Sequence, residues 1–340
     1  MTVAFFSETS SSLVKKHLNP DLYQQLRHLK TYSGFTLEKA IRSGIRNPDS
    51  NVGIYAGDAE SYQIFSPVFD PIIHEYHHFP EGKAHVSDFT VPDLPLMDQE
   101  GKYILSTRIR AARNLKGYEF PPQISPSHRK ELEKTVIKAL GELEEDLGGE
   151  YVSLKNIEKN PAQPFKGDIL VFEKGDRFQD AAGINSDFPE GRGVFYSLDR
   201  RLMVWVNEED HLRIMSLEKT SDLSAAFRRL GRALQVLDTR LDFAWDKTYG
   251  YLTSCPTNLG TAMRAGVHIR LEKLDRNREI LNNLAREYHL QIRGTRGEKT
   301  KVEAAVFDIS NTQRLGITET AIILNLHKGI AALIKAEEHL

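Results

Sequence analysis

Hydrophobic and polar positions follow two different patterns along the chain, and the change falls near residue 83. Residues 1–83 show helix-starting sequences at Pro20 and at Thr36, and a third helical segment over residues 59–76. The alternation of apolar and polar residues that is typical of strands is nearly absent there. This part of the chain therefore predicts a small all-helical domain.

The third helical segment contains two prolines. Asp58 stands directly before it and is a candidate capping residue, because a short acidic side chain can accept hydrogen bonds from the first N–H groups of a helix. Pro67 and Pro71 each lack a backbone N–H donor, so they are expected to break the segment into shorter helices.

A different pattern starts after residues 84–100, a stretch with two prolines and no clear period that is predicted to be a linker. The strands expected beyond it cover residues 103–110, 169–172, 202–206, 267–271 and 302–307. A helix is expected at residues 223–241, where large apolar residues recur at three- and four-residue spacing. Strands and helices in irregular order predict an α+β domain over residues 101–340.

Composition and charge narrow the class of protein. Of the 340 residues, 27% are charged and 40% are hydrophobic, which is typical of soluble globular proteins. The net charge of −2 argues against a general nucleic-acid binder, and no apolar run approaches the ~20 residues that cross a bilayer. The single cysteine excludes an intramolecular disulfide. We expect a cytoplasmic protein without nucleic-acid or membrane partners.

The first strand of the larger part carries candidate phosphate ligands. Ser106, Arg108 and Arg110 lie two residues apart, so their side chains share one face of a strand. Two guanidinium groups side by side suit a polyphosphate, because each can bind an oxyanion through two hydrogen bonds. Taken alone, the pattern favours a solvated edge strand.

Three consecutive carboxylates, Glu208, Glu209 and Asp210, follow the apolar strand at residues 202–206. Carboxylates at the end of a strand can orient a cationic substrate and hold the water molecules around a metal ion. Arg213 is close enough in sequence to point the same way. A charged turn in solvent with a surface salt bridge is the ordinary alternative.

The only cysteine, Cys255, lies in a loop shaped by proline and glycine and rich in hydrogen-bonding side chains. Thr257 is placed to donate to the sulfur and so to favour the thiolate. Arg264 and His268 follow in sequence. A lone cysteine is more often an inert packed residue, but this loop is an unusual place for one.

A second loop combines glycines with charged residues. Gly294 and Gly297 flank a segment that follows Arg293 and precedes Glu298, a composition expected of a loop that closes over bound phosphate. The alternative is a disordered polar turn. No GxxxxGK[ST] or GxGxxG phosphate-binding sequence occurs in the chain.

Together these stretches resemble the phosphagen kinase family over nearly the whole chain. The run Cys-Pro-Thr-Asn-Leu-Gly-Thr at residues 255–261 is similar to the family's signature loop, and residues 205–213, 294–298 and 306–310 carry further family motifs. The resemblance implies a small all-helical N-terminal domain and a larger domain with an antiparallel sheet flanked by helices. It also implies reversible phosphoryl transfer from MgATP to a small guanidino compound, by a monomer or a homodimer.

The resemblance assigns roles residue by residue. It implies catalytic roles for Glu209, Glu298 and Cys255, which would hold the guanidinium. It implies ATP or ADP binding by Ser106, Arg108, Arg110, Arg213, Arg264, His268, Arg293 and Asp308. Magnesium would arrive with the nucleotide, without a direct protein ligand and with Glu208 and Asp210 in its outer shell.

Residues 50–56 resemble the acceptor-specificity loop of arginine kinases, and the loop residues expected to bind the acceptor are Ser50, Asn51, Val52 and Tyr55. Free arginine is therefore the expected acceptor, with taurocyamine or glycocyamine as alternatives and an inactive nucleotide-binding module as a remote one. The bacterial protein-arginine kinases lack such a helical N-terminal domain. Two positions depart from the family: Asn51 replaces a common glycine, and Ile169 replaces a histidine that contacts adenine, so discrimination between purine bases should be weak.

Overall fold

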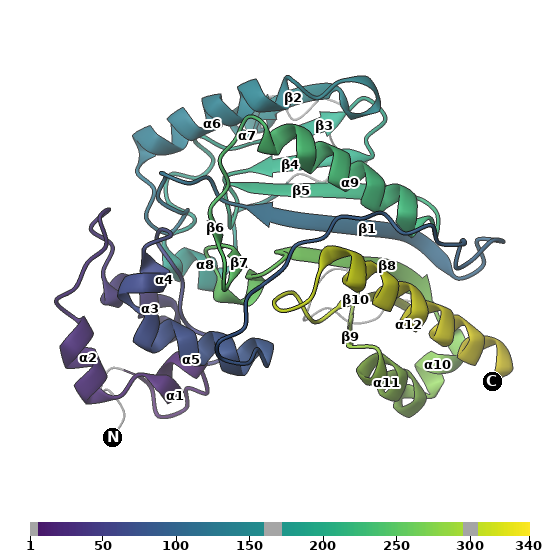
Figure 1. Ribbon diagram of the computed structural model, residues 1–340, viewed down its shortest axis with the longest axis horizontal. Helices are drawn as coiled ribbons and strands as arrows, with labels where there is room; N and C mark the ends of the chain where they lie inside the picture. Colours follow the sequence, from purple (N-terminus) through teal and green to yellow (C-terminus); the bar gives the residue numbers. More distant parts are fainter. Residues whose placement is uncertain (1–5, 160–171, 295–304) are drawn as a thin grey trace.

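The computed structural model describes residues 6–159, 172–294 and 305–340. A cluster of short helices from the first 77 residues lies beside a larger unit built on one broad antiparallel sheet (Figure 1). Residues 78–103 join the two and contain neither helix nor strand. The predicted α+β architecture is confirmed, and the predicted linker at residues 84–100 lies inside this joining stretch.

The N-terminal part is helical, as the sequence predicts. Its helices are α1 (Leu13–His17), α2 (Pro20–Leu26), α3 (Leu37–Arg46), α4 (Ser61–Ile64) and α5 (Ser66–His77). Asn19 and Thr36 cap α2 and α3, because each side chain accepts a hydrogen bond from the backbone N–H three residues on. Ordinary capping hydrogen bonds therefore explain the two helix starts that were expected at Pro20 and Thr36.

The third predicted helical segment divides differently from expectation. The break falls at Phe65, between α4 and α5, and Pro67 lies in the first turn of α5, where a proline costs no hydrogen bond. Pro71 lies inside α5 without ending it, so the prediction that both prolines break the segment is wrong. Asp58 is buried and accepts from the Ser61 N–H at 2.9 Å, one turn before the predicted segment becomes helical.

The sheet has the strand order β2-β3-β4-β5-β1-β8-β10-β9, and all its neighbours pair antiparallel. Its strands are β1 (Ile104–Arg113), β2 (Gly149–Ser153), β3 (Gly193–Ser197), β4 (Leu202–Val206), β5 (Leu212–Glu218), β8 (Met263–Arg270), β9 (Leu290–Arg293) and β10 (Val306–Asn311). Four of the five predicted strands overlap β1, β4, β8 and β10. In the fifth, Phe172 is buried but not in a strand, and residues 169–171 lie outside the described part of the chain.

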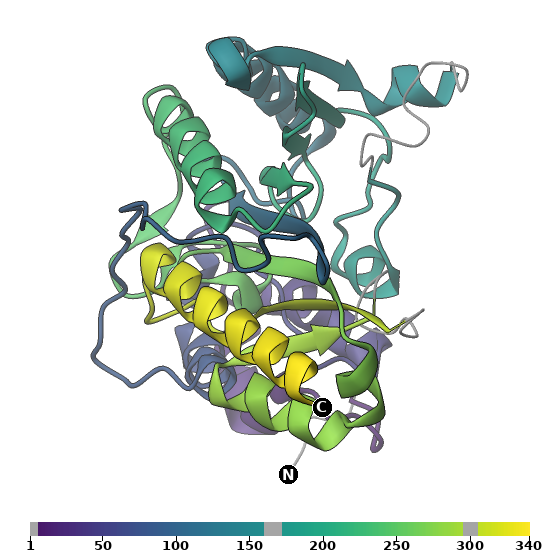
Figure 2. The same ribbon diagram turned by 90° about the vertical axis from the view of Figure 1, so that its right-hand side faces the viewer.

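One face of the sheet is covered by long helices. These are α6 (Pro126–Leu140), α9 (Leu223–Asp238), α11 (Arg278–Glu287) and α12 (Glu319–His339). Figure 2 shows α9 and α12 on the same side of the sheet, where α9 packs on β1 and β5 and α12 packs on β8 and β10. The main core lies between these helices and the sheet, where Phe227 of α9 packs with the inward-facing strand residues Ile109 and Phe307.

The other elements of the described chain are shorter. They are η1 (Glu145–Leu147), α7 (Leu154–Lys159), α8 (Arg177–Ala182), α10 (Glu272–Arg276), β6 (Trp245–Asp246), β7 (Gly250–Tyr251) and η2 (Pro256–Asn258). Helix α8 packs on α3, where the Ser43 hydroxyl donates to the Phe178 carbonyl at 2.9 Å. None of the described helices has the length and apolar character needed to cross a membrane.

Candidate active site

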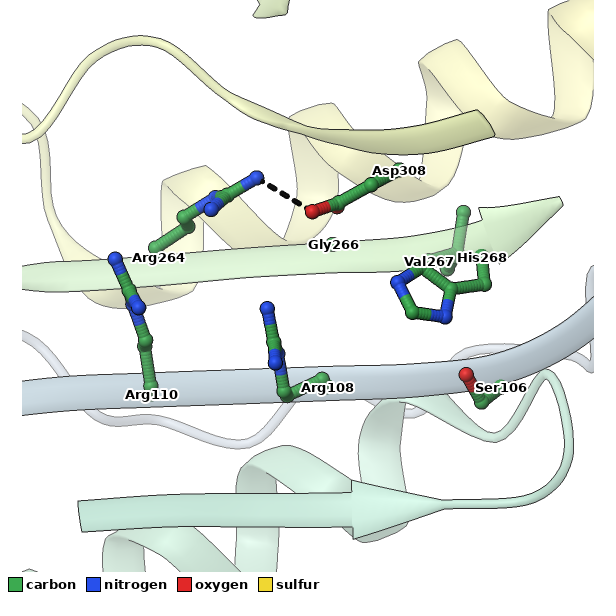
Figure 3. A pocket seen from close by; sticks show the side chains of 8 residues that line it. All are labelled: Ser106, Arg108, Arg110, Arg264, Gly266, Val267, His268 and Asp308. Atoms are coloured by element: carbon green, nitrogen blue, oxygen red, sulfur yellow. Dashed lines mark hydrogen bonds and ion pairs between the residues drawn. The ribbon is translucent and has the colours of Figure 1, made fainter. Parts of the chain in front are cut away.

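Strands β1, β8 and β10 place the predicted nucleotide ligands on one face. In the β1–β8 ladder Ser106 stands opposite His268, and Arg110 stands opposite Arg264. Residues directly opposite each other in an antiparallel pair project to the same side of the sheet. These side chains, together with Asp308 of β10, line one small pocket (Figure 3). The structure therefore brings together residues that are up to about 200 positions apart in sequence.

Arg264 is the arginine held most firmly in this pocket. Its Nη2 donates to Asp308 Oδ2 at 2.8 Å, and its Nε donates to Ser310 Oγ at 2.9 Å. Ser310 Oγ also accepts from Gln291 at 3.2 Å, and Gln291 in turn accepts from Arg293 Nη2 at 3.0 Å. This network orders two of the predicted phosphate ligands through neighbouring strands before any anion binds.

The arginines of this pocket lie close together, and few carboxylates are near enough to balance their positive charge. Burial lowers the pKa of Arg110 well below its ordinary value, and the charges of Arg213, Arg264, Arg108 and Arg314 lower it further. Burial, together with the charges of Arg293, Arg108 and Arg314, lowers the pKa of Arg264 to about 10, although Asp308 opposes the shift. Such mutual repulsion is relieved when a polyanion binds among the guanidinium groups.

The three carboxylates after β4 form a fixed turn beside this cluster. The turn is closed by the Asn207 N–H, which donates to the His211 carbonyl at 2.8 Å. Arg213 donates to Glu208 Oε1 at 3.1 Å and to Glu209 Oε2 at 3.2 Å. Burial lowers the pKa of Arg213, but these carboxylates outweigh it and the net shift is upward. Glu209 is therefore held in place without a substrate.

Burial also changes the acidity of the carboxyl groups. Burial and the neighbouring Glu208 raise the pKa of Glu209 to about 7, against the opposing charge of Arg213. Burial raises the pKa of Asp210 as well. Asp210 Oδ1 accepts from Asn114 at 2.7 Å and from the backbone N–H of Ser254 at 2.7 Å, so it anchors the loop that carries the cysteine.

Cys255 is buried and directly precedes η2, and the charge of Glu209 is close enough to affect the pKa of the thiol. Its Sγ lies 3.1 Å from Thr257 Oγ1, as the sequence predicts. Burial and Glu209 nevertheless raise the pKa of the thiol to about 12, and the bonds from Thr257 only partly oppose the shift. The expectation of a thiolate is therefore wrong for the protein without substrate, because desolvation outweighs one hydroxyl donor.

The predicted acceptor loop, residues 50–56, lies against the cysteine loop. The Ala56 N–H donates to the Ser254 carbonyl at 2.8 Å. Tyr55 is buried, and the charges of Cys255 and Glu209 reinforce the effect of burial in raising its pKa. Ser50 and Val52 are buried, whereas Asn51 is exposed.

Two predicted residues, Glu298 and Ile169, lie outside the described part of the chain. Within that part, no group of three His, Cys, Asp or Glu side chains has the arrangement of a metal site. The pKa of His268 is lowered by burial and by the charges of Arg108 and Arg264, against the opposing effect of Asp308, so its ring is neutral near pH 7.

Sequence reasoning missed two residues of this site. Gly266 stands opposite Arg108 in the ladder, and a Cβ there would lie 2.7 Å from the Ile309 carbonyl oxygen. A glycine inside a strand signals such a close approach and could have been noticed. Arg314 is buried near Arg110 and Arg264, and donates to the Thr257 carbonyl at 3.0 Å. No sequence pattern singled it out.

Family models match both parts of the chain. The model described as the ATP:guanido phosphotransferase C-terminal catalytic domain matches residues 131–340. The model for the N-terminal domain of the same family matches residues 8–74.

Curated relatives give the same family. An arginine kinase of Penaeus monodon is 45% identical over 332 residues, which cover 97% of this chain and 93% of the relative. An arginine kinase of Anthopleura japonica is 45% identical over 333 residues, but this chain spans only 46% of that relative's length.

Solved structures share the fold. A lombricine kinase superposes with a TM-score of 0.92 at 32% identity, covering 97% of this chain and 93% of that one. The substrate-free duplicated taurocyamine kinase from Schistosoma mansoni gives a TM-score of 0.90 at 33% identity, and this chain covers 48% of it. With an antiparallel sheet that gathers arginines next to a largely buried carboxylate and a thiol, and with both family models matched, this chain belongs to the ATP:guanido phosphotransferase family.

Proposed function

We propose that this protein transfers the γ-phosphoryl group of MgATP reversibly to the guanidino group of free L-arginine, giving phosphoarginine and ADP. The observation that carries the proposal is the position of Glu209, whose side chain is 14% exposed, and of the buried thiol of Cys255 beside the arginine cluster of β1 and β8. One half of the site suits a polyanion and the other suits a cation. Arginine is preferred as the acceptor because the relatives at 45% identity are named arginine kinases.

Phosphoryl transfer depends mainly on alignment and on neutralisation of charge. In this proposal the nucleotide phosphates are held by Ser106, Arg108, Arg110, Arg213, Arg264 and Arg293, with His268 and Asp308 nearer the adenosine. The bonds from Arg264 to Asp308 and Ser310 fix one guanidinium in advance, so little ordering is needed when the nucleotide binds.

Magnesium enters with the nucleotide and neutralises charge that develops on the phosphate oxygens. We propose that phosphate oxygens and water hold it, with protein carboxylates in the outer shell. The two predicted there are Glu208, which pairs with Arg213, and Asp210, whose Oδ1 accepts two hydrogen bonds that anchor the cysteine loop.

The acceptor must be oriented and must lose a proton. A guanidinium group has a pKa above ~12, so it offers no lone pair to phosphorus while fully protonated. Glu209 is the proposed group that fixes the plane of the guanidinium and accepts a proton as the N–P bond forms, with Glu298 as its partner. A raised pKa suits this role, because a base works best when its pKa lies near the working pH.

Cys255 is proposed to act by charge and not as a nucleophile. Binding of a guanidinium places a positive charge beside the thiol, which favours the thiolate and opposes the effect of burial. Binding of the acceptor thus favours the Cys255 thiolate, and the negative charge of the thiolate then stabilises the bound guanidinium. Residues 50–56 would recognise the amino-acid end of the acceptor, since Ala56 links this loop directly to the cysteine loop.

A coupled assay of ADP formation, with phosphorus NMR of the product, tests the proposal. We expect ADP formation that requires both magnesium and arginine, and a phosphoarginine signal. ATP binding without turnover would favour the inactive nucleotide-binding module. Turnover only with taurocyamine or glycocyamine would keep the family chemistry and change the acceptor.

A further inference from the structure

Every carbonyl oxygen of the cysteine loop, residues 253–257, accepts a hydrogen bond, and most of the donors come from other parts of the chain. The outside donors are the Tyr62 hydroxyl to Thr253 at 2.7 Å, the Ala56 N–H to Ser254 at 2.8 Å, His77 Nε2 to Pro256 at 2.8 Å and Arg314 Nη1 to Thr257 at 3.0 Å. The Cys255 carbonyl accepts from the Thr253 hydroxyl at 2.8 Å and from the Asn258 N–H at 3.0 Å.

Three of these outside donors belong to the helical N-terminal part of the chain. Tyr62 is in α4, Ala56 ends the acceptor loop, and His77 is the last residue of α5, which packs on η2. The conformation of the catalytic loop is therefore determined largely by residues that carry no chemistry of their own.

We propose that His77 is a positioning residue for Cys255, and that its hydrogen bond to the Pro256 carbonyl lets helix α5 hold the thiol in place. Pro256 directly follows Cys255 and is the first residue of η2, so a change in the orientation of its carbonyl also changes the backbone that carries the sulfur. The carbonyl can only accept, so Nε2 of His77 must carry the proton.

Burial lowers the pKa of the His77 ring to about 4, the bond to Pro256 opposes this shift, and the charge of Arg314 adds to it. The ring is therefore neutral near pH 7, and the bond to the Pro256 carbonyl requires its proton on Nε2.

His77 offers a cleaner test than the other donors. Ala56 donates through its backbone, Tyr62 is fully enclosed in the core, and Arg314 lies among the arginines of the nucleotide pocket. Cys255 is the only cysteine in the chain, so a thiol reagent reports on this loop alone.

The experiment compares His77→Phe, which removes the donor, with His77→Gln, whose amide can still donate near the position of Nε2. His74→Phe is the matched control, because it places the same ring one turn earlier on α5. The rate of Cys255 alkylation by iodoacetamide and the kinetics with MgATP and arginine are measured for each variant, with the melting temperature as a check on folding.

We expect His77→Phe to raise the alkylation rate about five- to tenfold, the factor expected for one lost hydrogen bond. We expect a similar fall in kcat with KM for ATP unchanged, because the arginine cluster is not altered. His77→Gln should restore both values toward wild type.

Unchanged alkylation in His77→Phe would overturn the proposal, and so would an equal change in His74→Phe or a failure of His77→Gln to restore the rate. The kinetic arm rests on the proposed function, but the alkylation arm does not. A protein with no arginine kinase activity would therefore still test the role of His77.

Discussion

Burial determines the charge state of the two groups proposed to hold the guanidinium. Glu209 has its pKa raised to about 7, and Cys255 has its pKa raised to about 12. Both shifts disfavour the negative form while the site contains no cation. An acceptor cation should shift both groups toward their charged forms, so binding and ionisation are coupled at these two residues.

Replacing Glu209 by glutamine keeps its size and removes its charge and basicity. We expect kcat to fall by a factor on the order of 10²–10⁴, the usual contribution of a general base. Steady-state kinetics with saturating MgATP measure this loss. Near-wild-type kcat in Glu209→Gln would mean that another group accepts the proton.

The pH profile tests the same residue independently. In the free enzyme kcat/KM for the acceptor should fall as the pH drops below about 7, because protonation removes the base. The same fall in the pH profile of kcat should occur at lower pH, because the bound guanidinium favours the carboxylate form of Glu209. The fall should vanish in Glu209→Gln; if it persists there, it belongs to another group.

Cys255→Ala tests whether the thiol acts by charge. The variant should lose kcat by a factor on the order of 10², comparable with the removal of one preorganised electrostatic group, and should retain measurable turnover. Alkylation of the wild-type thiol should block activity outright, because the added group occupies the acceptor site. Wild-type rates in the alanine variant would instead assign Cys255 a packing role.

At the scale of elements, the turn between β7 and β8 places the cysteine loop against the segment that follows β10. Gly260 has φ +90°, and a Cβ there would lie 2.2 Å from the Arg314 carbonyl oxygen. Thr261 continues the contact, because its N–H donates to the same carbonyl at 2.9 Å. The turn thus needs a glycine for two separate reasons.

A pair of substitutions separates those reasons. Gly117 also has a positive φ, +83°, but a Cβ added there would meet nothing within 4 Å, so Gly117→Ala should cost only about 1–2 kcal/mol of backbone strain. Gly260→Ala should lower the melting temperature clearly more, because the backbone must also move apart. Equal melting temperatures for the two variants would show that the close approach adjusts without cost.

Local signals predicted some elements well and others poorly. The bounds of β4 were predicted to the residue, because its apolar run at residues 202–206 is short and sharply limited. Pro71 misled the prediction for α5, because a proline inside a helix is tolerated when buried side chains such as Phe69 and Ile72 pack it on neighbours. The edge strand β2 has a mixed exposure pattern and gave no signal in the sequence.

The site was predicted from its family motifs more completely than from local pattern. The motifs point to Arg108, Arg110 and Arg264, but the meeting of these arginines on one sheet face depends on the β1–β8 register, which no local pattern contains. Gly266, Arg314 and the donors to the cysteine loop depend on contacts between segments far apart in sequence. Of these, only Gly266 had a signal in the sequence, as a glycine inside a strand.

At the scale of the whole molecule, the proposed site combines the sheet, the cysteine loop and the helical N-terminal part. The sheet supplies the arginines, and residues 50–56 supply the wall where the acceptor's amino-acid end would bind. Under the proposed function, such a division would let the acceptor change while the phosphate ligands stay the same; solved structures that share this fold are named for lombricine and for taurocyamine. We propose residues 1–83 and 101–340 as the two domains, joined by residues 84–100.

Free arginine is the proposed acceptor. Initial rates at fixed MgATP with arginine, taurocyamine, glycocyamine and lombricine, each over a range of concentrations, test this assignment. We expect the highest kcat/KM for arginine, with phosphoarginine as the product. A higher kcat/KM for any of the other three compounds would contradict it.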